Sequence, residues 1–128
     1  MSQINTNAVD DLAMGEPEEE SVVIDLRTEE HRHIILVEGE IDIVNAPRLH
    51  ERLTAAIESE EDDVSVDLSG VSFIDSTGLG VLVNARQRAK ALGATLKLTL
   101  PTGQARFPFE VTGLASIFDT PTAGTPRE

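Results

Sequence analysis

The hydrophobic and polar positions of this chain repeat with two different periods. Alternation with a period of two is typical of half-buried strands, whereas apolar residues three and four positions apart are typical of amphipathic helices. Strand patterns occupy residues 21–27, 34–41, 64–68, 95–100 and 115–118. Helix patterns occupy residues 45–59, 79–92 and 102–112. The chain therefore predicts the order β-β-α-β-α-β-α-β.

Turn and cap residues separate these segments. Residues 28–32 are expected to join the first two strands, and Pro47 fits the first turn of the first helix. Gly93 stands where a C-terminal cap of the second helix is expected. Pro108 removes a backbone donor from the third helical segment, so we expect that helix to kink or to start late. The hydrogen-bonded part of the third strand is expected to end near Leu68.

This order of elements indicates an α/β fold. Strands that alternate with helices imply right-handed crossovers, so we expect helices packed on a mixed sheet that is mainly parallel after its first hairpin. Residues 21–119 are enough for one compact domain. Residues 1–20 are polar and acidic, and we expect a disordered N-terminal tail there. Residues 120–128 are interpreted as a flexible C-terminal tail.

The net charge of the chain limits the classes of macromolecule that it is expected to bind. The formal net charge is -13, and residues 1–21 carry six acidic side chains with neither Lys nor Arg. This balance repels nucleic-acid phosphates and anionic membranes, and four Phe without Tyr or Trp offer little stacking surface for bases. Proteins are the expected partners. No apolar run approaches the ~18 to 20 residues that span a bilayer, and no secretion signal is visible, so we expect a cytoplasmic protein.

The residues that could form a functional site lie where the third predicted strand meets the second predicted helix. In the segment 73–80, Asp75, Ser76 or Thr77 can accept hydrogen bonds from the first free amides of the helix. A plain helix cap explains this tetrapeptide by itself. Function is favoured by its place at the carboxyl end of a parallel strand, where open α/β sheets present their sites. Two hydroxyls at a helix N-terminus also suit a phosphate, because the free amides and the dipole accommodate its charge.

The helix after this turn is apolar on more sides than core packing requires. The residues concerned are Leu79, Val81, Leu82, Val83 and Ala85. Burial between neighbouring elements and a docking surface for a partner are both compatible with this excess. Adding about -1.5 to -2 charges beside Asp75 would repel an acidic or apolar partner surface, so phosphorylation can act as a switch.

Several motifs together resemble bacterial anti-sigma factor antagonists of the STAS domain family. The segment from Phe73 to Leu82 is similar to the phosphorylation turn of that family. Three further segments resemble it in the same order: Gly39-Glu40-Ile41-Asp42 with Ala46-Pro47, Gly93-Ala94-Thr95-Leu96, and Phe109-Glu110-Val111-Thr112-Gly113-Leu114. The resemblance spans about residues 21–119 and implies a STAS-like mixed sheet flanked by helices.

The resemblance implies a non-enzymatic switch protein without a cofactor. In the family, the unphosphorylated antagonist binds an anti-sigma factor that is also an ATP-dependent serine kinase, and so releases a sigma factor. Phosphorylation of the serine after the aspartate, Ser76 here, ends that binding, and a metal-dependent serine phosphatase restores it. Thr77 is the second candidate acceptor. The implied partner-binding residues are Asp42, Asp75, Ser76, Thr77, Gly78, Leu79, Gly80 and Val81.

The chain departs from the family pattern near its C-terminus. Pro108 stands where the family usually has Leu, and nothing after Phe118 resembles the amphipathic helix that commonly closes the domain. The alternative function within the same family is a scaffold or regulatory module of a larger signalling assembly.

Two other classes of function use the same residues. A hydrolase would use Ser76 as nucleophile, but the nucleophile-elbow pattern needs Gly at position 74, where Ile stands. His31, His33 and His50 have no metal-ligand spacing, and cysteine is absent. A nucleotide site at Gly78 and Gly80 lacks the following Lys that would make the motif specific.

Overall fold

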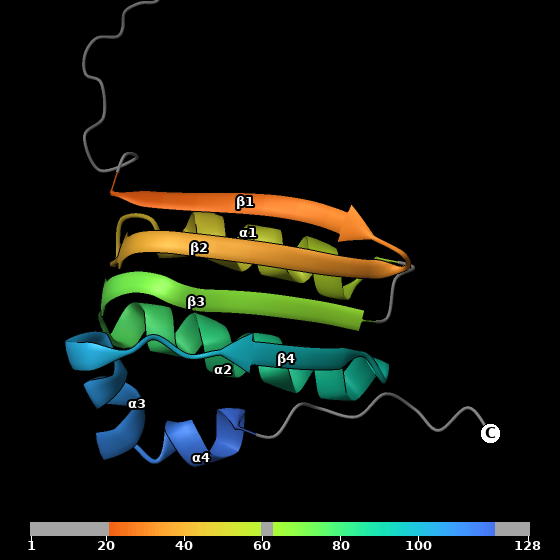
Figure 1. The fold of residues 1–128 in the computed structure, drawn as a ribbon. Helices are drawn as coiled ribbons and strands as arrows, with labels where there is room; N and C mark the ends of the chain where they lie inside the picture. The colour runs from red at the N-terminus through yellow and green to blue at the C-terminus, as the bar shows by residue number, and fades with distance from the viewer. Residues whose placement is uncertain (1–20, 60–62, 120–128) are drawn as a thin grey trace, which may run out of the picture.

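The computed structural model describes residues 21–59 and 63–119, which form a four-stranded sheet with helices packed on it (Figure 1). The strands are β1 (Val22–Glu29), β2 (Arg32–Ile41), β3 (Asp63–Ile74) and β4 (Thr95–Thr99), in the spatial order β1-β2-β3-β4. β1 is antiparallel to β2, whereas the β2–β3 and β3–β4 pairs are parallel. The expected mixed, mainly parallel sheet is therefore confirmed.

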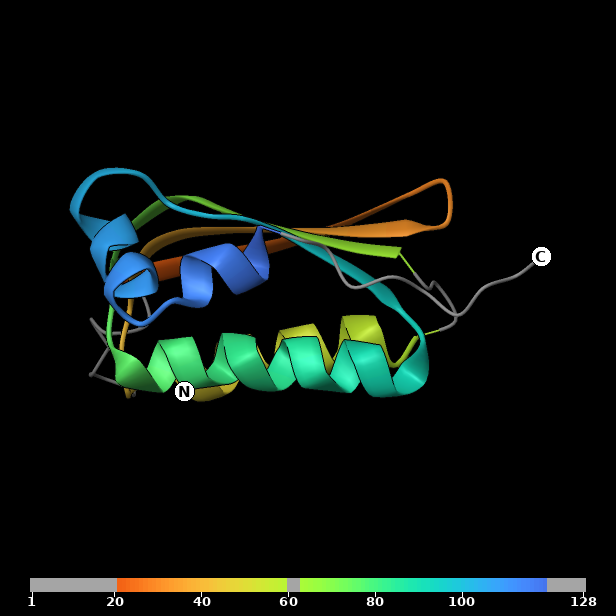
Figure 2. The ribbon, with the colours of Figure 1, turned by 90° about the horizontal axis from the view of Figure 1, so that it is seen from below.

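Two long helices cover one face of this sheet. α1 (Ala46–Ile57) follows β2, and α2 (Ser76–Leu92) follows β3. Figure 2 shows α1 and α2 side by side on the same side of the sheet. Each helix returns the chain to the start of the next parallel strand, so both helices begin at the carboxyl edge of the strands. That edge carries the segments 42–45 and 75–78.

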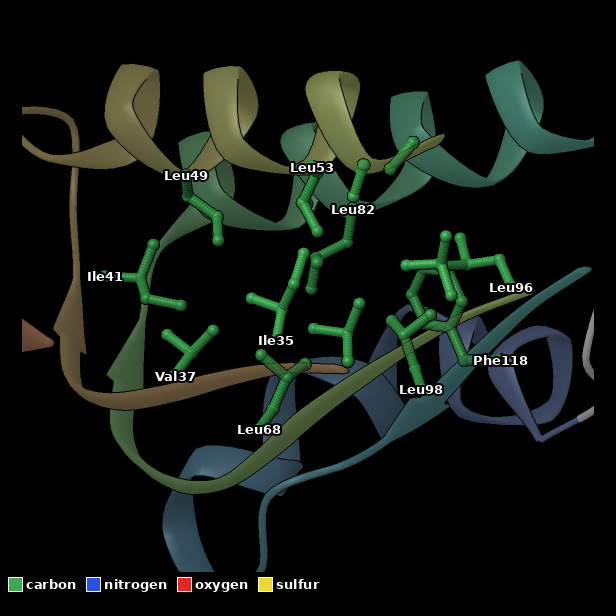
Figure 3. Packing of buried hydrophobic residues seen from close by; sticks show 14 of the residues in the cluster. Ile35, Val37, Ile41, Leu49, Leu53, Leu68, Leu82, Leu96, Leu98 and Phe118 are labelled. Carbon is green, nitrogen blue, oxygen red and sulfur yellow. The ribbon is translucent and has the colours of Figure 1, made fainter. Parts of the chain in front are cut away.

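The core lies between these two helices and the sheet. Figure 3 shows Leu49 and Leu53 of α1 and Leu82 of α2 on the helix side of this core. Ile35 and Val37 of β2 lie opposite them, and both are almost completely buried. The buried residues therefore form one apolar layer. The strands contribute every second residue to it, and the helices contribute residues three and four positions apart.

The C-terminal part corrects one expectation. Residues 115–118 were expected to form a last strand, but α4 (Leu114–Phe118) is a short helix beside the β4 edge. Gly113 has φ 80°, a conformation that redirects the chain before α4 begins. Phe118 is buried, and its ring packs edge-to-face on Phe109 with centroids 6.0 Å apart. Four residues are too few to distinguish a period of two from one helical turn.

The segment around Pro108 behaves as expected. A 3₁₀ helix, η2 (Gly103–Arg106), precedes α3 (Phe107–Val111), and the proline lies in the first turn of α3. A proline is tolerated there because the first helical amides have no intrahelical acceptor. The helix therefore starts late.

β3 is longer than expected on one side. It pairs with β4 only as far as Asp67, but its pairing with β2 continues to Ile74. The β2–β3 register shifts twice between Leu36 and Glu40, and Gly39 adopts φ 108° within this stretch. These irregularities let the strands stay paired up to the turn. The end near Leu68 is therefore wrong for the pairing with β2.

The expected tails, residues 1–20 and 120–128, lie outside the described residues. The segment beyond α4, where a closing amphipathic helix would stand, lies outside them as well. Within residues 21–59 and 63–119, no helix combines the length and the apolar character that a membrane crossing requires.

Candidate functional site

Asp75 forms the turn between β3 and α2. Its backbone is extended, with φ -98° and ψ -176°, and its Oδ1 accepts a hydrogen bond of 3.1 Å from the Gly78 amide. Its own amide donates to the Ile41 carbonyl oxygen at 3.1 Å. Asp75 is thus the N-cap of α2 and also attaches the turn to the end of β2. The helix-cap role that the sequence indicated is present.

Ser76 is the first residue of α2, and its side chain is exposed. Its hydroxyl has no hydrogen-bond partner among the residues that the structure describes. Thr77, the second candidate acceptor, is half-buried. Of the two hydroxyls, that of Ser76 is therefore the more accessible to another protein.

Gly78 lets the first turn of α2 pack on the ends of two strands. A Cβ at this position would lie 2.7 Å from Cγ2 of Ile41 and 2.7 Å from Cγ1 of Ile74. These distances are shorter than real Cβ contacts, so a side chain would push α2 away from the sheet. Gly78 is thus explained by packing inside the domain.

Asp42 lies in the segment between β2 and α1. Its Oδ1 accepts hydrogen bonds from the amides of Val44 (3.0 Å) and Asn45 (3.1 Å). The Asp42 amide in turn donates a hydrogen bond of 3.0 Å to Asn45 Oδ1. This reciprocal pair holds the loop in one conformation.

Asn45 was not singled out from the sequence. It is the buried polar residue among the described ones, with 4% of its surface exposed. Its Nδ2 donates to the Glu40 carbonyl oxygen at 2.8 Å and to the Ser21 hydroxyl at 3.1 Å. An Asn at the start of a predicted helix usually indicates a cap, so only its buried environment reveals that it joins Ser21 before β1, the end of β2 and the Asp42 loop.

The sheet register brings both carboxylates to one edge. Ile41 and Ile74 are paired residues of the parallel strands β2 and β3, and Asp42 and Asp75 follow them directly. Parallel strands end at the same edge, so Asp42, Asp75 and Ser76 lie together there. The sequence predicted that the turn at Asp75 and Ser76 lies at the carboxyl end of a parallel strand, and the structure has it there.

The apolar excess of α2 is mostly accounted for by packing. Leu82 is buried, and Leu79, Val81 and Val83 are half-buried against the core. Gly80 differs from them, because it is exposed and a Cβ there would meet no heavy atom within 4 Å apart from its chain neighbours and the surrounding backbone of α2. The predicted partner-binding residues therefore divide into core residues and outward-facing ones.

Exposed apolar side chains flank the turn, and sequence reasoning missed them. Ile43 is 69% exposed and Val44 is 59% exposed in the Asp42 loop, and Phe73 near the end of β3 is 49% exposed. Two consecutive apolar residues in a loop were the available signal. Phe73 also lines a hollow of about 190 Å³ with Phe107, smaller than the ~300 Å³ at which small-molecule sites begin.

His31 and His33 lie at the β1–β2 turn or at the start of β2. His33 is near the start of β2, at the opposite end of the sheet from Ser76, and its ring nitrogens contact Thr28 Oγ1 (3.0 Å) and Ser59 Oγ (2.9 Å). His33 is therefore not placed to act as a general base for Ser76. Over residues 21–59 and 63–119, no group of three His, Cys, Asp or Glu side chains is arranged to hold a metal ion.

Comparison with known proteins extends these observations. The family model for the STAS domain matches residues 17–128. The anti-sigma-B factor antagonist of Bacillus subtilis (strain 168) is 35% identical over 99 residues, covering 77% of this chain and 90% of that protein. The antagonist of the same name from Listeria monocytogenes is 35% identical over 100 residues, covering 77% and 88%.

A solved structure shares the fold. The crystal structure of an anti-sigma factor antagonist from Mycobacterium paratuberculosis superposes with a TM-score of 0.68 at 29% identity. The superposition covers 77% of this chain and 84% of that chain.

Proposed function

The chain belongs to the STAS domain family, and from this premise we propose that it is a cytoplasmic anti-sigma factor antagonist controlled by phosphorylation of Ser76. Unphosphorylated, it binds an anti-sigma factor serine kinase, which then releases its sigma factor. Phosphorylated, it no longer binds, until a metal-dependent serine phosphatase removes the phosphate. The chain itself catalyses no reaction and needs no cofactor, because ATP belongs to the kinase and the metal to the phosphatase.

The observation that carries the proposal is the exposed Ser76 side chain at the start of α2, directly after Asp75 and at the same sheet edge as the Asp42 segment. A phosphate on this oxygen would have about -1.5 to -2 charges at pH 7. The N-terminus of a helix tolerates this charge, so the fold would persist. The partner-facing surface would change instead.

Charge repulsion gives the modification its effect on binding. Asp75 is adjacent to Ser76, and Asp42 lies at the same sheet edge, so the phosphate would add to a surface that already has two carboxylates. Like charges brought together in an interface cost several kcal/mol, and every 1.4 kcal/mol weakens affinity about tenfold. Phosphorylation would therefore lower the affinity by orders of magnitude.

The alternative within the family is a scaffold or regulatory module in a larger assembly. The two named antagonists are matched over 90% and 88% of their own lengths, which supports a comparable role for this chain. A reconstituted system separates the two functions. An antagonist frees a sigma factor from its complex with the anti-sigma factor, whereas a scaffold leaves that complex intact.

The acceptor is tested by incubating the chain with ATP and each anti-sigma factor kinase of the source genome, and mapping the phosphate by mass spectrometry. We expect one phosphate, on the peptide that contains Ser76. Ser76→Ala should abolish it. Ser72→Ala is the matched control, because Ser72 is also exposed and lies on β3 near the same edge. Phosphate on another residue, or on Ser76→Ala, would contradict the assignment.

A further inference from the structure

β1 forms one edge of the sheet, and no other strand of the described residues lies along its outer side (Figure 1). The strand is eight residues long and pairs with β2 along its whole length without a register shift. Proteins usually protect such edges with Pro, Lys, a β-bulge or a very short strand, and β1 has none of these features. β1 therefore presents a regular row of backbone groups to which another strand can add.

Alternate residues of β1 direct their backbone groups outward. The carbonyl oxygen of Ser21 accepts a hydrogen bond from the Glu40 amide, so the backbone groups of odd-numbered residues face β2 and those of even-numbered residues face away. Among the described residues, one hydrogen bond reaches the outward groups, from Arg52 Nη1 to the Ile24 carbonyl oxygen at 3.4 Å. This distance is long for a hydrogen bond from nitrogen to oxygen, so a main-chain amide can replace Arg52.

The sequence of β1 is complementary to itself in an antiparallel arrangement. Centred on Leu26, two copies would place Asp25 of each opposite Arg27 of the other, and Ile24 opposite Thr28. Asp25 and Arg27 are both more than half exposed, and within one chain they are 3.6 Å apart. This register also sets even-numbered residues opposite one another, so that their outward backbone groups can exchange hydrogen bonds.

Leu26 supplies an apolar contact at the centre of this arrangement. It alternates in phase with Val22 and Ile24, which are buried, yet 44% of its surface is exposed. A second copy would bring the two Leu26 side chains directly opposite each other, with about 5.5 Å between their Cα atoms. Each leucine would then cover the other, which accounts for an apolar residue at an otherwise exposed position.

The net charge of the chain does not prevent this contact. β1 itself has two acidic residues, Asp25 and Glu29, and one basic residue, Arg27, so its formal charge is -1. Six of the acidic side chains of the chain belong to residues 1–21, outside β1. At physiological ionic strength, exposed charges more than about 8 Å apart are largely screened. The opposite charges of Asp25 and Arg27, directly across the contact, are therefore the ones that matter most.

We propose that two copies of this chain associate through their β1 strands, which pair antiparallel around Leu26 and join two four-stranded sheets into one of eight strands. The contact has twofold symmetry, so each copy contributes the same residues. Because the two β1 strands run in opposite directions, the edges that carry Ser76 lie at opposite ends of the dimer. Both edges stay open to another protein, and the inference does not depend on the proposed function.

The association is measured by sedimentation of the full chain at physiological ionic strength, between about 10 μM and 1 mM. Contacts below about 1,200 Å² are typical of weak complexes, so we expect a dissociation constant between about 1 μM and 1 mM. The weight-average mass should therefore rise with concentration and reach at least about 1.5 times that of the monomer at 1 mM. A chain that stays monomeric at this concentration would overturn the proposal.

Charge reversal tests the pairing of the two strands. Asp25→Arg sets the introduced arginine opposite Arg27 of the second copy, and Arg27→Asp sets two acidic residues opposite each other. Like charges directly opposite destabilise strand pairing, so each variant alone should be monomeric at 1 mM. An equimolar mixture of the two variants restores both opposite-charge pairs and should recover the mass of wild type. Recovery also demonstrates that both variants are folded.

Lys97→Asp is the matched control for Arg27→Asp. It changes the net charge by the same amount on an exposed residue of β4, the strand at the other edge of the sheet. This variant should associate like wild type. Three results would overturn the proposal: association of either single β1 variant at the level of wild type, failure of the mixture to recover, or loss of association in Lys97→Asp.

Discussion

The amide of Asp75 donates a hydrogen bond of 3.1 Å to the carbonyl oxygen of Ile41. This bond joins the turn between β3 and α2 to the last residue of β2, directly before Asp42. Asp42 and Asp75 therefore lie on two segments that a backbone hydrogen bond holds together. Substitutions in the turn should therefore change both the stability of α2 and the surface that we propose binds the anti-sigma factor.

Removing the cap should destabilise α2 without unfolding the domain. Asp75→Ala eliminates the acceptor for the Gly78 amide, and loss of an N-cap costs about 1 kcal/mol. We expect Tm to fall by about 4 to 8 °C in thermal unfolding. Asp75→Asn keeps an acceptor and should be much closer to wild type in stability. Equal losses for the two variants would show that charge, rather than the hydrogen bond, matters at this position.

A side chain at Gly78 should have the opposite effect on stability from one at Gly80. Gly78→Ala places a methyl group against Ile41 and Ile74, and overpacking of this kind costs about 1 to 3 kcal/mol. The midpoint of urea denaturation should therefore fall for Gly78→Ala and rise for Gly80→Ala, because alanine favours a helix interior more than glycine does. Similar shifts in both variants would mean that the two environments do not differ as described.

Asn45 should be more important for stability than its loop position suggests. Asn45→Ala removes the partners of the Asp42 amide and the Glu40 carbonyl, and each buried polar group left unpaired costs about 1 to 3 kcal/mol. We expect a clear loss in urea denaturation and faster hydrogen exchange at the Asp42 amide. Asn84→Ala on the exposed face of α2 is the control and should change stability by less than about 0.5 kcal/mol. Unchanged exchange at Asp42 would contradict the role given to Asn45.

The packing of α4 is tested by Phe118→Ala. Phe118 is 3% exposed and packs on Phe109, so its truncation should cost about 3 to 5 kcal/mol. Ile117→Ala is the control, because the neighbouring side chain is 43% exposed and should cost far less. Comparable losses for both variants in denaturation would disagree with a helix that buries only one face.

Periodicity predicted the longer elements because their burial is regular. Leu49 and Leu53 repeat at helical spacing, and Val64, Val66 and Leu68 are buried at every second position of β3. The same reasoning failed at residues 115–118, where one helical turn and a short strand bury similar positions. It also ended β3 near Leu68, because strand pairing beyond that residue depends on the irregular stretch of β2 around Gly39.

The candidate site was accessible to sequence reasoning only in part. The cap at Asp75 and the hydroxyl at Ser76 follow from local residue preferences. The exposure of Ile43 and Val44, and the open space at Gly80, depend on how α1 and α2 pack on the sheet. Tertiary packing decides which residues of an apolar segment remain at the surface.

The central claim is that a phosphate on Ser76 decides whether the anti-sigma factor can bind. The most direct measurement is the affinity of that factor for the unphosphorylated chain and for the chain phosphorylated at Ser76 alone, by calorimetric titration in the same buffer. The account predicts that phosphorylation weakens binding at least about a hundredfold, or about 2.7 kcal/mol, with the Tm of the chain little changed. Equal affinity of the two forms would contradict it.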